Sequence, residues 1–404
     1  MIFTMAWRNI WRNKIRSIII MLSIAVGMFA GIAVLALYKG MMKARTRTVI
    51  DSEVGHLQLH HPGFAEDFDP KFTLRNGSQI LQEIQSMEGV KLAAPRSITN
   101  GMLATPGGSS GVQIMGVIPG PEYAASQLDK KLVEGKLFDD AKKNQVIIGK
   151  KLAVKMRLKP GSKLVLMFTD TSGGIVSGAF RIAGIYRSAN APLDERRVYI
   201  RMKDMNSLLS TGSAFHEIVV LLNRDEDVPL LQKQLQQKWK SFSIQSWRNI
   251  SPETDLMVNT TNQLSYILMT IIMLALAFGI INTMLMAILE RTKEIGIMMA
   301  LGTSRLKIFL LVILETWMLT FAGTPVGFLV AWFSIAHYNR QGMDLSGMGK
   351  ELMSSFGYST LIYPEFPADK LPGVLLIVFI TALVSSLLPA RKALMMQPVE
   401  ALRR

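Results

Sequence analysis

Residues 289–307 read LERTKEIGIMMALGTSRLK, and this charged stretch between two long apolar runs decides how the chain is organised. Charged residues follow the uncharged run 264–289 at once, and Arg305 and Lys307 come just before the next apolar run. Between the charges lies the apolar segment 295–301, closed by Gly302, a residue common just past a helix end. The pattern predicts a short helix at a membrane surface, which either anchors the chain or is gripped by a partner. We favour the gripped helix.

The bulk composition is that of a membrane protein. Hydrophobic residues make up 49% of the 404 and charged residues only 19%, which is too apolar for an ordinary soluble chain. A net charge of +15 would suggest nucleic acid in a soluble protein, but here the basic residues cluster at the ends of apolar runs, so a nucleic-acid partner is excluded. The chain has no cysteine, which excludes disulfide, thiolate and lipobox chemistry.

Four apolar runs are long enough to cross a bilayer, which takes about 20 residues. They are residues 17–38, 264–289, 308–338 and 371–388. The first follows four basic residues, as a signal peptide does. Its 22 uncharged residues exceed the roughly 7–15 of a cleavable signal core, so we predict a retained anchor.

Basic residues beside the spans predict the orientation. Segments 1–16, 290–307 and 391–404 each carry four Lys or Arg, whereas 337–371 carries three over about twice the length of any of them. Both termini, including the tail 389–404, and the loop 290–307 are therefore expected in the cytoplasm, with 39–263 and 339–370 outside it. Within 1–16, Trp7, Ile10, Trp11 and Ile15 fall at helical spacing among basic residues. This predicts an amphipathic helix on the cytoplasmic surface, and a plain anchor is favoured over a regulatory role.

The large segment 39–263 reads as an α+β domain. It carries 30 basic and 22 acidic residues, which favours an anionic partner or a lipid surface. Helical patterns continue the first span through 39–54 and recur at 78–87 and 228–240, while alternation predicts strands, with 107–111 as a turn. The expected strands are 56–60, 112–117, 145–148, 163–168, 179–185, 197–200, 218–222 and 244–247. We predict two strand–helix units flanking a β-rich insertion at about 134–212.

No catalytic constellation is found. The chain lacks G-x-x-x-x-G-K-[ST] and H-E-x-x-H, so it is not expected to be an enzyme or to bind a cofactor or metal itself. His56, His60 and His61 could ligate a metal, but His60 and His61 are adjacent and would face opposite sides of a strand, so the non-metal interpretation is favoured.

Glu315 is the one carboxylate inside a predicted span. Intramembrane charges are candidates for function, including proton relay. Glu315 lies only about 12 Å along a helix from Lys307 at the cytoplasmic edge, so packing against the 290–304 helix is favoured.

The whole chain resembles the FtsX-like permeases of the MacB/LolC/LolE type of ABC transporter. The resemblance lies in the four spans, in ERTKEIGI at 290–297 and ALGTSR at 300–305, and in PARKA at 389–393 with PVEALR at 398–403. It implies that the 290–304 helix is a coupling helix seated in a groove of a cytoplasmic ATPase. The residues implied are Glu290, Arg291, Lys293, Glu294, Ile295, Gly296, Ala300, Leu301, Gly302 and Arg305, and Glu315 matches a glutamate that the family often carries early in its third span.

The resemblance also implies an architecture and partners. The fold would be an α-helical membrane protein with four transmembrane helices plus a large extracytoplasmic α+β domain, whose porter-like part is interrupted by a small β-rich insertion. It would lie in the bacterial inner membrane with a second permease, either its own copy or a paralogue. A separate ABC ATPase dimer would bind ATP and Mg and drive mechanical work in the periplasm.

The segment GHLQLHHPGF at 55–64 is similar to the LolC/LolE branch, which extracts lipoproteins from the inner membrane. This favours lipid and lipoproteins as partners, with a periplasmic carrier possible. Two alternatives stay open: MacB-like efflux of drugs, peptides or toxins with outer-membrane partners, and an FtsX-like signalling permease that regulates a cell-wall hydrolase.

Overall fold

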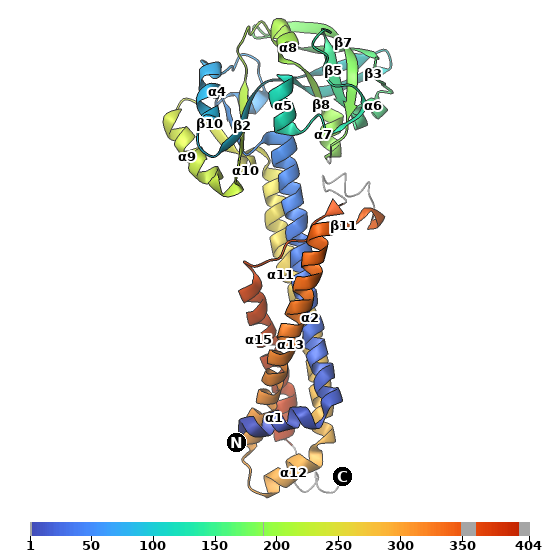
Figure 1. The fold of residues 1–404 in the computed structure, drawn as a ribbon, viewed down its shortest axis with the longest axis vertical. Helices are drawn as coiled ribbons and strands as arrows, with labels where there is room; N and C mark the ends of the chain where they lie inside the picture. The colour runs from blue at the N-terminus through green and yellow to red at the C-terminus, as the bar shows by residue number, and fades with distance from the viewer. Residues whose placement is uncertain (1, 189, 349–360, 396–404) are drawn as a thin grey trace. The chain divides into compact units, whose positions relative to one another are not determined.

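The computed structural model describes residues 2–188, 190–348 and 361–395 and divides into two compact units (Figure 1). The bundle unit comprises residues 1–42, 258–344 and 361–404, and the sheet unit comprises residues 43–257 and 345–360. The closing motif predicted at 398–403 and residues 349–360 of the loop 339–370 lie outside the described residues.

The bundle unit is made of helices. Their bounds are α1 Ile2–Arg12, α2 Lys14–Val49, α11 Pro252–Glu290, α12 Thr292–Ala300, α13 Arg305–Gln341 and α15 Leu371–Leu394. Four of them, α2, α11, α13 and α15, are long and apolar enough to cross a membrane, and each contains one predicted span. Short strands β11 (Met343–Asp344) and β12 (Leu361–Ile362) pair between α13 and α15. The prediction of four transmembrane helices is confirmed.

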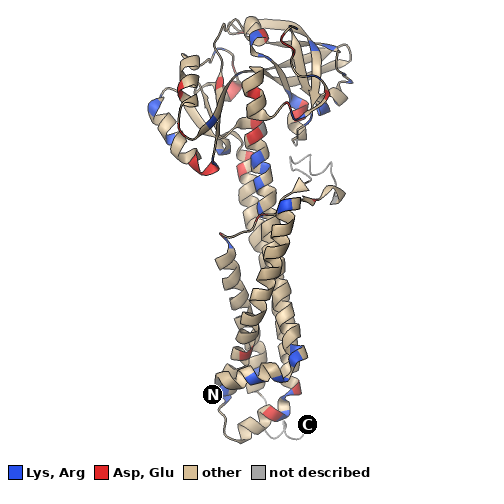
Figure 2. Cartoon of the chain, viewed as in Figure 1, with Lys and Arg blue, Asp and Glu red and all other residues tan. Residues whose placement is uncertain are grey.

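Charge and packing in this unit follow the membrane pattern. Figure 2 shows Lys, Arg, Asp and Glu gathered at the end that carries α1 and α12, with few along the spans. Inside, α13 approaches α2 closely at Gly323 and Gly327, where an added Cβ would lie 2.7 Å from the Met21 carbonyl oxygen and 2.4 Å from that of Ala25. Small residues allow this contact between spanning helices, which lack a hydrophobic drive to associate in lipid.

The sheet unit holds one ten-stranded mixed sheet, ordered β10-β1-β9-β2-β3-β8-β5-β7-β4, with β6 paired to β2 and β7. The strands are β1 Leu57–His60, β2 Val90–Thr105, β3 Gly108–Val117, β4 Leu132–Gly135, β5 Gln145–Gly149, β6 Lys163–Thr169, β7 Ile175–Tyr186, β8 Arg197–Arg201, β9 Glu217–Leu222 and β10 Ser243–Ser246. The pairs β3–β8 and β5–β7 are parallel.

Helices cover this sheet in two groups with separate apolar cores. One core packs α4 (Gly77–Gln85) and α9 (Val228–Lys238) on β1 and β9, and the other packs α6 (Lys150–Lys155) and α8 (Met202–Leu209) on β5 to β8. The remaining elements are α3 Phe64–Asp67, α5 Pro119–Ser126, α7 Ala191–Arg196, α10 Trp247–Ile250 and the 3₁₀ turns η2 Asp225–Asp227 and η3 Ser346–Met348. The helical continuation predicted for 39–54 is present: α2 runs to Val49, and the π-helical turn η1 (Ile50–Val54) follows.

Two details differ from the sequence-based expectations. The long strand β2 is not predicted at all, because Pro95 argues against a central strand and seven consecutive buried residues, 93–99, show no alternation. The turn predicted at 107–111 is shorter, since the chain turns at Pro106 and Gly107 and β3 begins at Gly108, which pairs with Thr105. The strands within the predicted β-rich insertion at about 134–212 lie in the same sheet as the rest of the unit, the sheet that the 16-residue β2 extends into.

Candidate functional site

The candidate coupling site is the short helix α12 with the residues around it. Arg291, with φ −98° and ψ 17°, separates the end of α11 from the first residue of α12. After Ala300 the chain turns at Gly302, whose φ of +87° is one that residues with a side chain rarely adopt. The structure therefore ends this helix where the sequence predicts. Figure 1 shows α1 and α12 at the same end of the bundle unit.

One side of α12 packs into the bundle. Ile295 and Gly296 are buried. Ile295 belongs to a core that also contains Ile10 of α1, Ile288 of α11 and Ile308 of α13. Two of the predicted coupling residues therefore serve to seat the helix, because burial of their face holds α12 against three neighbouring helices.

A buried ion pair fixes the junction between α11 and α12. The Nη1 of Arg291 lies 3.3 Å from Oε1 of Glu315 on α13, and both side chains are about nine-tenths buried. The Nη2 of Arg291 donates to the main-chain oxygen of Asn9 on α1 at 3.0 Å. Removing one partner of a buried pair costs about 3–5 kcal/mol, because the other charge stays buried without compensation. Glu315 thus contacts the junction beside α12, and Arg291 joins three helices.

Two further ion pairs connect the acidic residues of this region to the N-terminal helices. Glu294 of α12 pairs with Arg12 of α1, and Glu290 at the end of α11 pairs with Arg16 of α2. Both glutamates are about half exposed, so each pair contributes at most about 1 kcal/mol to stability. Their effect is geometric, since the first pair joins α1 to α12 and the second joins α2 to the end of α11.

The other side of α12 and the following turn are open to solvent. Lys293, Ile297 and Leu301 are spaced four residues apart, so they share one face of the helix. The exposed fraction is 48% for Ile297 and 82% for Leu301. The remaining predicted coupling residues on this side, all exposed, are Ala300, Gly302 and Arg305.

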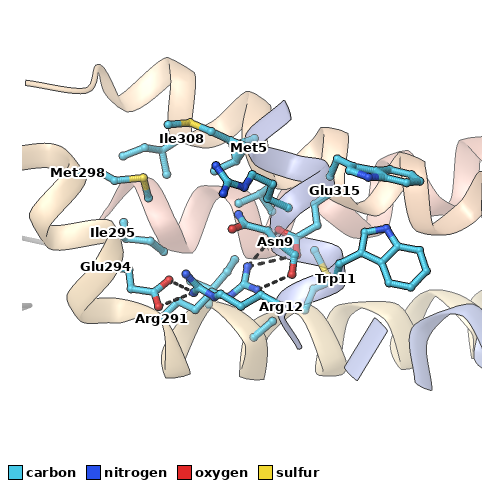
Figure 3. A pocket seen from close by; sticks show the side chains of 17 residues that line it. Met5, Asn9, Trp11, Arg12, Arg291, Glu294, Ile295, Met298, Ile308 and Glu315 are labelled. Carbon is cyan, nitrogen blue, oxygen red and sulfur yellow. Dashed lines mark hydrogen bonds and ion pairs between the residues drawn. The ribbon is translucent and has the colours of Figure 1, made fainter. Parts of the chain in front are cut away.

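A cavity of about 870 Å³ lies between α1, α11, α12 and α13. In Figure 3, apolar side chains such as Met5, Trp11 and Met298 line it, and the pairs of Arg291 with Glu315 and Arg12 with Glu294 lie at its wall. Packed interiors resist displacement, and here packing is incomplete. Beside this cavity, α12 is joined to α1 by the Arg12–Glu294 pair and by the core that Ile295 shares with Ile10.

Three partners in this site are missed by sequence reasoning. Asn9, Arg12 and Arg16 lie more than 270 residues from the groups they contact. The sequence feature that could have identified Arg12 and Arg16 is charge, because the basic stretch at 8–16 is opposite in sign to Glu290 and Glu294.

The three histidines of the segment 56–61 do not converge. The Nε2 of His56 lies 2.9 Å from Oδ1 of Asp225, while its Nδ1 accepts from the amide of Leu222 at 3.2 Å. His60 Nδ1 contacts the main-chain oxygen of His61, whose ring stacks on Phe72. Among the residues that the structure describes, no group of three His, Asp or Glu side chains could hold a metal ion.

Comparison with known proteins adds to this geometry. Residues 17–238 match the family model of the MacB-like periplasmic core domain, and residues 266–398 match that of the FtsX-like permease C-terminal region. The lipoprotein-releasing system transmembrane protein LolC of Neisseria meningitidis is 26% identical over 97% of this chain and 95% of its own length. The macrolide export ATP-binding/permease protein MacB of Campylobacter jejuni is 24% identical over all of this chain and 61% of its own length. The pyoverdine export ATP-binding/permease protein PvdT of Pseudomonas savastanoi is 24% identical over 98% of this chain and 58% of its own length. The chain thus spans about three fifths of these two export relatives.

Proposed function

This chain belongs to the MacB/LolC family of ABC transporter permeases, and we propose that it is the membrane subunit that converts ATP hydrolysis by a partner into mechanical work outside the cytoplasm. Its sequence carries no phosphate-binding motif, so the proposal places ATP and Mg on a separate ABC ATPase dimer. A second permease, either its own copy or a paralogue, completes the transporter. In this proposal the chain spans the inner membrane, with α1, α12 and both termini on the cytoplasmic side.

The observation that carries this proposal is the two-sided character of α12. Its inner face is seated by Ile295 and by the Arg291–Glu315 pair, so a push on the helix reaches α11 and α13. Its outer face exposes Ile297 and Leu301, apolar side chains of the kind that a partner's groove covers.

For the cargo we propose lipoproteins of the inner membrane. The relative named for lipoprotein release matches this chain over nearly its whole length, whereas the chain spans only part of the two export relatives. Efflux of drugs, peptides or toxins is the second candidate, because those export relatives match almost all of this chain.

The first experiment is a mild-detergent purification of the tagged protein from its own host, with identification of everything that accompanies it. We expect an ABC ATPase together with acylated lipoproteins. Leu301→Asp should lower the recovered ATPase about tenfold or more, because it buries a charge in the contact. The matched control is Leu230→Asp on α9, an apolar residue with 63% exposure in the sheet unit. Recovery of no ATPase with the parent chain, or equal recovery with Leu301→Asp, contradicts a gripped α12.

The second experiment separates the cargo classes. In a strain lacking this chain, we expect lipoproteins destined for the outer membrane to accumulate in the inner membrane, as detected by membrane fractionation. Wild-type lipoprotein sorting would rule out release as the function. Drug sensitivity with an outer-membrane channel in the purified complex would instead indicate efflux, and a cell-wall hydrolase bound to the sheet unit would indicate a signalling permease.

A further inference from the structure

The end of α2 in the sheet unit has an unusual local structure. The helix closes with the single π-helical turn η1, Ile50–Val54, and the chain then turns at Gly55, φ +72°, into β1. An added Cβ at Gly55 would lie 2.3 Å from Cγ2 of Val219, so a side chain is excluded there. Single π turns interrupt the α-helical hydrogen-bond pattern and are frequent at functional sites.

Four side chains converge on one residue of this turn, Glu53, which is 8% exposed. Its Oε1 accepts from Asn190 Nδ2 at 2.8 Å and from Arg45 Nη1 at 3.3 Å. Its main-chain oxygen accepts from Nη1 of Arg96 and Nη1 of Arg197, each at 3.3 Å. The carbonyl left free at the helix end is therefore held by two guanidinium groups.

These groups reach Glu53 from both halves of the sheet unit, one half around β1 and β9 and the β-rich half around β5 to β8. Asn190 precedes α7 and Arg197 begins β8, so both lie in the β-rich half. Arg96 lies on β2, and its Nε and Nη2 donate to the two carboxylate oxygens of Glu122 on α5 at 2.8 and 2.9 Å. Glu217 on β9 is 3.5 Å from Arg96 as well.

The same network reaches the first turn of α11. The division between the two units falls within α11, as it also does within α2. Nη2 of Arg45 lies 3.4 Å from Oγ1 of Thr254, a fully buried hydroxyl. The start of α11 and the end of α2 are therefore fixed to each other within the sheet unit through Arg45.

The cost of this arrangement argues for a role beyond stability. Arg45, Glu53, Arg96, Glu122 and Glu217 are each at most 8% exposed, and taking charges out of water is expensive. Well-packed apolar residues of similar volume usually stabilise a fold as well as a buried ion pair does. What apolar contacts do not supply is directional attachment of one helix end to several strands.

We propose that Arg45, Glu53, Arg96 and Arg197, here called the Glu53 joint, fix the end of α2 to both halves of the sheet, so that displacement of α2 moves the sheet unit as one body. They are positioning residues, which touch no cargo. This inference deepens the proposed function and rests on it, because only a mechanical permease needs to pass a helix movement to its outer domain.

The test replaces one ion pair of the joint by apolar residues of similar volume, Glu53→Leu with Arg45→Met. The control makes the equivalent change in an exposed pair of the same unit, Glu83→Leu with Lys238→Met, whose charges lie 2.6 Å apart. Glu53→Gln is the conservative variant, since its amide oxygen still accepts from Asn190. All variants are made in the full chain with its co-purified ATPase.

The first measurement is a spin-label distance between Arg47→Cys, exposed on α2, and Lys151→Cys, exposed on α6 in the β-rich half. Because the chain has no cysteine, only these two positions take the label. The parent, the control and Glu53→Gln should give one narrow distance, with and without ATP. The apolar pair should give a broadened distribution, and an unchanged narrow distance would overturn the joint.

The second measurement is ATP-driven release of a triacylated reporter lipoprotein from proteoliposomes. With the apolar pair we expect release per ATP hydrolysed to fall about tenfold while ATPase activity and melting temperature stay at the parent value. Full release would overturn the role in transmission, and equal loss of release, ATPase and melting temperature would show a role in folding alone. If the parent itself releases no reporter, the proposed function fails, and the distance measurement still decides whether the joint holds α2.

Discussion

Lowering the pH from 7 to 5 should destabilise the central strands of the sheet unit, because His216 is held neutral in the folded chain. Nδ1 of His216 accepts from the amide of Ile98 on β2 at 3.0 Å, and Nε2 contacts the main-chain oxygen of Pro70 at 3.0 Å. One ring nitrogen must accept, so the ring is neutral. The side chain is fully buried, and burial lowers the pKa of His216 from 6.5 to about 4.

The sign follows from proton linkage. Between pH 6.5 and about 4 the unfolded chain binds a proton at His216 that the folded chain does not, so the free energy of unfolding falls as the pH falls. Each pKa unit is worth about 1.4 kcal/mol, so the contribution of His216 at pH 5 is a loss of about 2 kcal/mol. Burial also raises the pKa of Glu217, which acts in the opposite direction, so the effect must be isolated by substitution.

The assay is hydrogen exchange of the full chain in detergent at pH 7 and pH 5, corrected for the intrinsic pH dependence of exchange. We expect the fall in protection of the Ile98 amide between pH 7 and pH 5 to be about thirtyfold larger in the parent chain than in His216→Gln, as about 2 kcal/mol requires. Protection in α15 should stay equal in the two proteins. An equal change in protection in the parent chain and in His216→Gln would show that the folded pKa of His216 is not lowered and would refute the reasoning.

Two further predictions concern the bundle unit. Gly327→Leu should destabilise the packing of α13 on α2 by about 3 kcal/mol or more, because its Cβ would lie 2.4 Å from the Ala25 main-chain oxygen. A melting curve followed by tryptophan fluorescence measures this loss. The control Gly279→Leu, whose Cβ would have nothing within 4 Å, should leave the melting curve unchanged. Glu294→Lys should abolish cargo release without affecting membrane insertion, because it places a second positive charge against Arg12. Adding Arg12→Glu in the same chain should restore release. Failure of this rescue would show that the pair does not position α12.

The helical part of the fold follows from local sequence. A run of about 20 apolar residues in lipid must satisfy its backbone hydrogen bonds within the segment, which a helix does. The four spans can therefore be predicted from the sequence. The short helix between the second and third spans is equally local, since charges flank an apolar segment that ends at Gly302. In the sheet unit, the helix at 78–87 and the strands with plain alternation are found for the same reason.

Tertiary structure alone decided how these segments meet. No local pattern marks β2, because a strand buried on both faces loses its alternation and Pro95 is tolerated only through the pairing around it. Arg291 contacts Glu315 and Asn9, and Glu53 contacts Asn190, although these residues lie far apart in the sequence. The local periodicity of apolar residues does not predict such contacts. Buried charges must find partners wherever the fold brings them, so the sequence determined which residues carry charge, and only the packing of distant elements determined what each charge holds in place.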